Sequence, residues 1–171
     1  MYNRSITIRE TTDGMFENLN HTLYTFFISM LPIVELRGAI PVGCGFGLPF
    51  WENYLVCTIG NLLPVPFILL FIRFILNWMK GVPHLSKIAN WVENKAHKHS
   101  ASIVKYAGWG LFIFVAIPLP GTGAWTGALI AAMLDMRMRK AFPVIAAGVL
   151  TAGLIVAGVS YGFLNFLKFM F

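Results

Sequence analysis

Two charged side chains lie in the middle of an apolar stretch. Glu35 and Arg37 fall within LPIVELRGAIPVGCG, residues 31–45. A charge at the centre of a lipid bilayer costs several kcal/mol, so ionisable residues in such segments usually face a cavity or one another. An ion pair that only fixes the local geometry is the structural interpretation of this pair.

A functional interpretation divides the chemistry between the two side chains. The Arg37 guanidinium offers a rigid fork of donors that suits phosphate, and it does not lose its proton. The Glu35 carboxylate is driven toward its neutral form by burial and held ionised by a neighbouring cation, a competition that suits a proton-coupling group. We therefore expect Arg37 to bind an anionic substrate and Glu35 to couple its movement to an ion.

Residues that interrupt helices surround the charged pair and recur in a second apolar stretch. Pro32, Gly38 and Pro41 flank the charges, and Pro118 and Pro120 belong to IPLPGTG further along the chain. Proline removes a main-chain donor and clashes with the preceding turn, so we expect both stretches to break near their middle as hairpins. Each half is then too short to cross a bilayer, as in a re-entrant hairpin whose tip faces protein or water.

The second interruption carries no charge, so anion binding there must come from the backbone. Gly121, Thr122 and Gly123 form its tip. The half-helix that follows presents free N–H groups and the positive end of its dipole, and glycines allow a ligand to approach closely. A tight glycine turn whose amides bond within the protein is the alternative. Asn61, in the apolar GNLLPVP, is expected either to line the substrate cavity or to bond a neighbouring helix.

The composition indicates the setting of these motifs. The 171 residues are 57% hydrophobic and 12% charged, with a mean hydropathy of +0.71, which predicts an all-α integral membrane protein. The net charge of +6 is spread between apolar stretches, so we expect contact with membrane lipids and no nucleic acid. Catalytic motifs and metal-ligand clusters are missing from the sequence, so no enzyme activity, cofactor or metal site is expected.

Two halves of the chain follow one plan. Apolar stretches lie at about 22–48, 53–79, 108–134 and 141–167, and the first and third are the interrupted ones. A shift of about 86 residues places the first interrupted stretch and its following helix on the second such pair. Broken helices at matching places in two halves indicate a transporter-type site at the membrane midplane.

The whole chain, residues 1–171, is therefore predicted to be a single membrane domain built as an inverted repeat. Each repeat combines a re-entrant helical hairpin with a transmembrane helix. Repeat one covers about residues 22–79 and repeat two about residues 108–167, and a basic amphipathic connector at about 80–107 joins them.

Basic residues predict which end of the protein faces the cytoplasm. In the hairpin arrangement the connector shares one face with RMRK, residues 137–140, while Arg4, Arg9 and Lys168 lie on the other. The positive-inside rule then places the connector in the cytoplasm and both termini outside. Four plain spans divide the charge in the same ratio, so the central prolines and charges, rather than the loops, favour hairpins.

The motifs LPIVELRGAIPVG and AIPLPGTGAWTGALIA resemble the small multidrug export family of bacteria and archaea, over about residues 24–165. That family is similar in turn to the DedA/VTT superfamily, whose members look like inverted-repeat carriers that translocate lipids, often with an ion-gradient dependence. The resemblance implies a multi-pass protein of the cytoplasmic (inner) membrane, with Glu35 and Arg37 matching the acidic and basic residues of the first hairpin motif. The second hairpin departs from the DedA pattern, because its tip PGTG lacks the arginine that typically stands there.

We therefore expect an ion-coupled secondary transporter or lipid translocase, driven by protons or sodium. Its substrate would be anionic, such as a polyprenyl phosphate or a phospholipid headgroup. A drug cation/proton antiporter, in which Glu35 alone binds substrate, and a non-transporting membrane scaffold are the alternatives. Two crossing helices leave a thin wall around any cavity, so a homodimer is also predicted.

Overall fold

The computed structural model describes residues 2–80, 100–119 and 121–170, and every regular element in this part of the chain is a helix. The predicted all-helical class is therefore confirmed. The helices are α1 (Tyr2–Met30), α2 (Glu35–Gly45), α3 (Phe50–Leu62), α4 (Pro64–Lys80), α6 (Ser100–Ala116), α7 (Ala124–Met133) and α8 (Met138–Met170).

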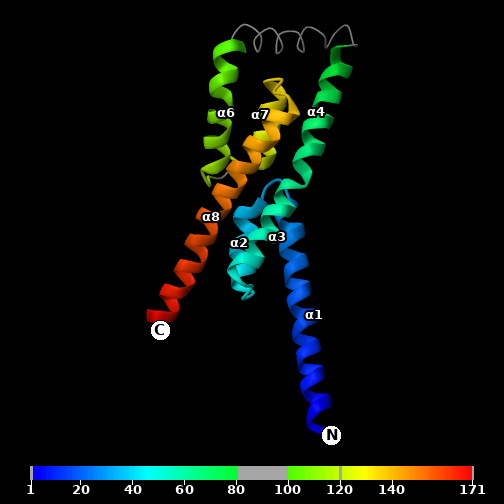
Figure 1. Ribbon diagram of the computed structural model, residues 1–171, viewed down its shortest axis with the longest axis vertical. Helices are drawn as coiled ribbons and strands as arrows, with labels where there is room; N and C mark the ends of the chain where they lie inside the picture. Colours follow the sequence, from blue (N-terminus) through cyan, green and yellow to red (C-terminus); the bar gives the residue numbers. More distant parts are fainter. Residues whose placement is uncertain (1, 81–99, 120, 171) are drawn as a thin grey trace.

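The helices form an elongated bundle in which two helix pairs turn back at mid-height (Figure 1). Helix α1 runs from the N-terminal end to the middle of the molecule, α2 returns beside it, and α3 and α4 then continue to the opposite end. Helix α6 descends from that opposite end to the middle, α7 returns, and α8 runs back through the whole bundle. Both termini consequently lie at the same end.

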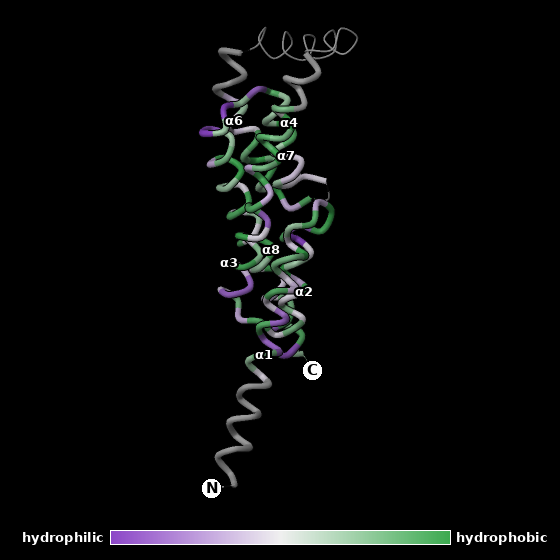
Figure 2. The backbone as a smooth tube through the Cα atoms, turned by 90° about the vertical axis from the view of Figure 1, so that its right-hand side faces the viewer, coloured by the Kyte–Doolittle hydropathy of each residue, from purple (hydrophilic) through white to green (hydrophobic). Residues whose placement is uncertain are grey.

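Two helical segments are long and apolar enough to cross a membrane. They are Phe50–Ile72, with 23 residues, and Met138–Met170, with 33 residues. The first bends between Leu62, where α3 ends, and Pro64, where α4 begins. Pro64 is well tolerated because it stands in the first turn of a new helix. Hydrophobic residues predominate in the middle of the molecule, and hydrophilic residues are more frequent toward the ends of its described part (Figure 2). These segments and the composition fit a membrane protein.

The ends of α2 and α7 share a pattern of main-chain hydrogen bonds. The N–H of Leu48 donates to the carbonyl of Gly43 at 3.0 Å, and the N–H of Met136 donates to the carbonyl of Ala131 at 2.9 Å. The residue before each donor is left-handed, a glycine with φ of 79° in the first half and an aspartate with φ of 49° in the second. This is the Schellman cap of a helix C-terminus, and it recurs after a shift of 88 residues (136 − 48).

Small residues allow the helices of the second half to pack closely. A Cβ added to Gly148 of α8 would lie 2.7 Å from the Cβ of Val115 in α6, so this crossing needs a glycine. Alanines fill much of the rest of the buried core, including Ala128, Ala131 and Ala152. This packing agrees with the use of small residues at helix interfaces in membranes.

Two residues that the sequence predicts as hairpin breakers lie inside a helix instead. Gly38 and Pro41 are both within α2, so this prediction is wrong for them. The interruption is already complete at residues 31–34, and α2 begins at Glu35. Pro41 then removes only one hydrogen bond from an established helix. Gly38 serves packing, because a Cβ there would overlap the Val34 side chain.

The remaining predicted breakers lie near two connections between helices. The first connection, residues 31–34, joins α1 to α2, and the second, residues 117–123, joins α6 to α7. Pro32 is in the turn that follows α1, and Pro118 is in the non-helical segment that follows α6. Pro120 lies outside the described residues, as does most of the predicted amphipathic connector, since residues 81–99 are not described. Within the connector's predicted range, α6 begins at Ser100.

Candidate functional site

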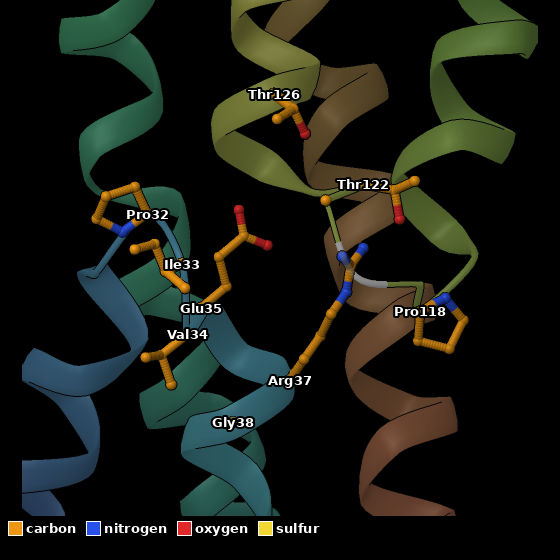
Figure 3. A pocket seen from close by; sticks show the side chains of 10 residues that line it. Pro32, Ile33, Val34, Glu35, Arg37, Gly38, Pro118, Thr122 and Thr126 are labelled. Carbon is orange, nitrogen blue, oxygen red and sulfur yellow. The ribbon is translucent and has the colours of Figure 1, made fainter.

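The two connections approach each other at mid-height and enclose a cavity of about 340 Å³ (Figure 3). Seven of the predicted site residues line it: Pro32, Glu35, Arg37, Gly38, Pro118, Gly121 and Thr122. Ile33, Val34 and Thr126 are the other described residues that line it. Segments about 85 residues apart in the chain therefore contribute to one cavity, with charged side chains from the start of α2 and uncharged residues from the second connection and α7.

The Glu35 carboxylate reaches the start of α7. It accepts a hydrogen bond from the main-chain N–H of Trp125 at 3.2 Å, and Trp125 is the second residue of that helix. The first turn of a helix has unpaired N–H groups and a partial positive charge, so this position stabilises an anion. A carboxylate from the start of α2 therefore lies at the helix start where the sequence predicts a backbone anion site.

Two backbone features make this approach possible. Glu35 has a φ of 51°, a left-handed conformation that few residues other than glycine adopt, and its side chain is only 5% exposed. Gly123, immediately before α7, packs directly against the carboxylate, because a Cβ at that position would overlap it. Gly123 therefore serves the site by its lack of a side chain, although it is not among the residues that line the cavity.

The Arg37 guanidinium reaches the other helix end of the same hairpin. Its Nη2 atom donates to the carbonyls of Val115 at 3.3 Å and Ile117 at 3.2 Å, and its Nη1 atom donates to the carbonyl of Leu119. These carbonyls belong to the last turn of α6 and the segment after it, at the negative end of the helix dipole. The Nε atom of Arg37 is buried and has no hydrogen-bond partner among the described residues.

The two charges therefore bond across the cavity and not to each other. The carboxylate lies at the positive end of α7 and the guanidinium at the negative end of α6, so each meets a helix dipole of opposite sign. This arrangement clamps the first connection to the second. It also means that the charges are held by main-chain groups, for which a ligand of the same sign can compete.

The tip of the second hairpin is closed by its own hydrogen bonds. The Thr122 hydroxyl lies 2.8 Å from the carbonyl of Ile117 and 3.0 Å from that of Leu119. Gly121 has a φ of 83°, which explains the glycine at this turn. Thr122 thus shares two of its carbonyl partners with Arg37.

Trp125 is the site residue that sequence reasoning missed. Besides its main-chain bond to Glu35, its indole Nε1 donates to the carbonyl of Met30, the last residue of α1, at 3.1 Å. Trp125 therefore ties the start of α7 to both ends of the first connection. A tryptophan two residues after PGTG was an available signal, since a buried indole N–H usually requires a partner.

Asn61 lies away from this cavity. Its side chain is 1% exposed within α3, and within the described part of the chain its Oδ1 atom has no hydrogen-bond partner. Asn53, another buried polar residue of α3, is not among the predicted site residues. Its side-chain amide donates to the carbonyl of Ile40 at 2.8 Å and to the hydroxyl of Tyr161 at 3.1 Å. These bonds join α3 to α2 and α8, so they position the α2 helix that carries the charged pair.

Comparison with known protein families gives a match over most of the chain. A family model described as "Putative small multi-drug export protein" matches residues 35–155, more than two thirds of the chain. The match begins at Glu35 and includes the whole second connection. Neither curated proteins nor solved structures give a significant match. The chain belongs to the small multi-drug export protein family.

Proposed function

We propose that this protein is a secondary transporter, and not an enzyme, that moves an anionic substrate through the cavity between the two connections. The observation that carries the proposal is the Glu35 carboxylate at the N-terminus of α7, across from Arg37. An internal carboxylate in a backbone anion site has the charge and the position that an anionic substrate would need.

The arrangement of helices supports a membrane carrier with two re-entrant hairpins. The α1–α2 and α6–α7 pairs turn back at mid-height, and α3–α4 and α8 run past them from end to end (Figure 1). With the membrane perpendicular to the long axis, the two units have opposite orientation and form an inverted repeat. Broken helices that meet at the midplane are the pattern found in carriers with a fixed central site.

The basic residues support an orientation in the membrane. Arg137, Arg139 and Lys140 follow α7 at the end where α4 finishes and α6 begins, opposite both termini. We propose that this end is cytoplasmic and that both termini are outside. The family resemblance favours the cytoplasmic membrane of a bacterium or an archaeon.

The proposed coupling follows from charge balance in the cavity. When Glu35 binds a proton, its side chain becomes neutral and its interaction with the start of α7 weakens, since the helix dipole favours the charged form. A substrate anion then takes the vacated N–H groups and pairs with Arg37, so the cavity keeps one negative and one positive charge. Transport of a monovalent anion would therefore carry one proton with it.

A proton suits this site better than sodium. The hydrogen bond that Glu35 makes comes from an N–H donor, whereas a hard cation needs several oxygen ligands around it. Sodium remains the second coupling ion to be tested, because Thr126 also lines the cavity and has a hydroxyl.

The cavity walls support a lipid-like substrate. Ile33 is 94% exposed beside the cavity, and Pro32, Val34 and Pro118 also contribute apolar walls. A volume of about 340 Å³ suits a phosphate-sized headgroup, with the chain of the lipid left outside. We propose an anionic lipid headgroup, from a phospholipid or a polyprenyl phosphate, as the substrate class.

A second candidate function is a drug cation/proton antiporter. It is favoured by the description of the matching family, and Glu35 is the one carboxylate among the described residues that line the central cavity. In that mechanism Glu35 binds cation and proton alternately, and Arg37 only tunes it. A scaffold without transport would use the same hydrogen bonds solely to hold the two connections together.

Proteoliposome transport distinguishes these functions. We would assay fluorescent phosphatidylglycerol and polyprenyl phosphate for anion movement, and ethidium for cation movement, each with a pH-sensitive dye inside. The anion carrier predicts that Arg37→Gln abolishes anion movement and that Glu35→Gln uncouples it from protons. The antiporter predicts ethidium movement that Glu35→Gln abolishes. Lys168→Gln, which removes a charge far from the cavity, is the matched control and should transport normally; no flux in any assay would refute both transport functions.

A further inference from the structure

A second hollow lies between α6 and the start of α8. It has a polar part of about 620 Å³ and an apolar part of about 460 Å³, which share Gly108, Pro143 and Val144. The two parts therefore form one continuous groove, which we call the α6–α8 groove. Among the described residues it shares no lining residue with the central cavity.

One end of the α6–α8 groove is strongly basic. Arg137, Arg139 and Lys140 line it, and all three residues are exposed. Asp135 is the one carboxylate among the described residues that line this end, so cations outnumber anions by three to one among those residues. Helix α8 begins at Met138 among these residues, and its N-terminal dipole adds further positive potential.

The other end of the α6–α8 groove is apolar. Trp109 and Phe112 of α6 line one side, with ring centroids 6.1 Å apart in an edge-to-face contact. Val144 and Ala147 of α8 line the other side. Gly108 deepens the groove where the two parts join, since the nearest atom to an added Cβ would be 4.0 Å away. Trp109 is 68% exposed, as is common for tryptophans near a membrane interface.

We propose that the α6–α8 groove binds one anionic phospholipid. The phosphate would lie among Arg137, Arg139 and Lys140, and an acyl chain would follow the apolar part past Trp109. Basic pockets between membrane helices bind lipid headgroups by this combination of charge and apolar surface. A soluble anion would leave the apolar part unused, and a zwitterionic lipid would gain little from three cations.

This lipid would be a resident ligand and not the transported substrate. It fills the space between α6 and α8, and α6 ends in the carbonyls that hold Arg37. Lipid binding along α6 from Gly108 to Phe112 would therefore stabilise the helix that closes the central cavity. The proposal depends on membrane insertion but not on the transport function, so the two can fail separately.

Native mass spectrometry of the full-length protein in detergent tests the proposal. We would titrate phosphatidylglycerol and phosphatidylcholine with identical acyl chains into the Arg37→Gln protein, which lacks the cation of the central cavity, and compare their dissociation constants for the first bound lipid. Each basic side chain near a membrane surface favours an anionic lipid by roughly fivefold. We expect phosphatidylglycerol to bind at least about tenfold more tightly. The triple variant Arg137→Gln/Arg139→Gln/Lys140→Gln should reduce this preference to about twofold or less.

Two further arms separate the parts of the groove. Lys168→Gln, at the other end of α8, should keep the full preference. Gly108→Leu keeps all basic residues but fills the junction of the groove, so it should weaken the first phosphatidylglycerol about tenfold by blocking the acyl chain. It also tests the site if the triple variant does not fold.

Glycerol 3-phosphate, the headgroup chemistry without acyl chains, should not displace the lipid at equal concentration. Equal affinity for the two lipids, an unchanged preference in the triple variant, unchanged binding in Gly108→Leu, or displacement by glycerol 3-phosphate would each overturn the proposal.

Discussion

The contact between Gly123 and Glu35 gives the sharpest prediction about the clamp between the two connections. Gly123 has an extended backbone, with φ of 170°, so alanine is free of backbone strain there. Its Cβ would nevertheless overlap the Glu35 carboxylate and displace it from the N–H of Trp125. A hydrogen bond to a charged group contributes about 1.5–3 kcal/mol, and overpacking costs about 1–3 kcal/mol. We expect Gly123→Ala to lower the free energy of unfolding by about 2–4 kcal/mol.

Thermal unfolding followed with a thiol-reactive dye measures this cost, because Cys44 and Cys57 are free and buried in the folded protein. The expected fall in melting temperature is roughly 5–15 °C. Gly110→Ala in α6 is the matched control, since a Cβ there meets nothing within 4 Å, and it should leave the melting temperature unchanged or slightly raised.

A double-mutant cycle isolates the contact itself. In a Glu35→Ala background the carboxylate is gone, so Gly123→Ala should cost less than about 1 kcal/mol, the remainder reflecting the poorer N-cap. An equal cost with and without the Glu35 side chain would refute the clamp as the reason for glycine at this position.

Three further predictions concern the rest of the molecule. Trp125→Phe removes the indole bond to Met30, and we expect a loss of about 1 kcal/mol in the same melting assay; an unchanged melting temperature would argue against that bond. Single cysteines replacing Glu52 and Arg139, in a background without the native cysteines, should be labelled from opposite sides of the membrane, whereas labelling from one side would exclude hairpins. Light scattering in detergent should give the mass of a dimer, and a monomer mass in both detergent and bilayer would contradict the homodimer prediction.

The sequence contains enough information to locate the two interruptions and to single out the charged pair as a buried polar feature. An Arg–Glu pair among apolar residues is costly unless it is satisfied, so its position alone predicts a buried polar contact. The partners of these charges could not be predicted, because main-chain atoms some 80–90 residues away carry no sequence signal. The prediction that Pro41 interrupts a helix was wrong for a related reason. A proline indicates the loss of one main-chain hydrogen bond, and whether the helix continues depends on the packing around it.

The length of the second connection also explains a difference in register. The prolines of the two interruptions match after a shift of about 86 residues, whereas the caps of α2 and α7 match after 88. The segment between α6 and α7, residues 117–123, is three residues longer than the turn at residues 31–34, and α7 is one residue shorter than α2, which leaves a difference of two. The added residues lie in the glycine-rich tip, after the prolines that match between the two halves. The shift that relates the two halves therefore changes within the tip itself.

The pH dependence of anion binding tests the proposed exchange between Glu35 and the substrate most directly. The assay compares binding of a radiolabelled polyprenyl phosphate to the wild type and to Glu35→Gln, whose neutral side chain imitates the protonated acid. Because the glutamine does not titrate, the pH dependence of binding to the variant shows the effect of the phosphate's own titration. Because Glu35 must be neutral before the anion binds, wild-type affinity relative to the variant should rise as the pH falls. At neutral pH the variant should bind more tightly than the wild type; weaker binding by the variant, or a ratio that does not change with pH, would contradict the exchange.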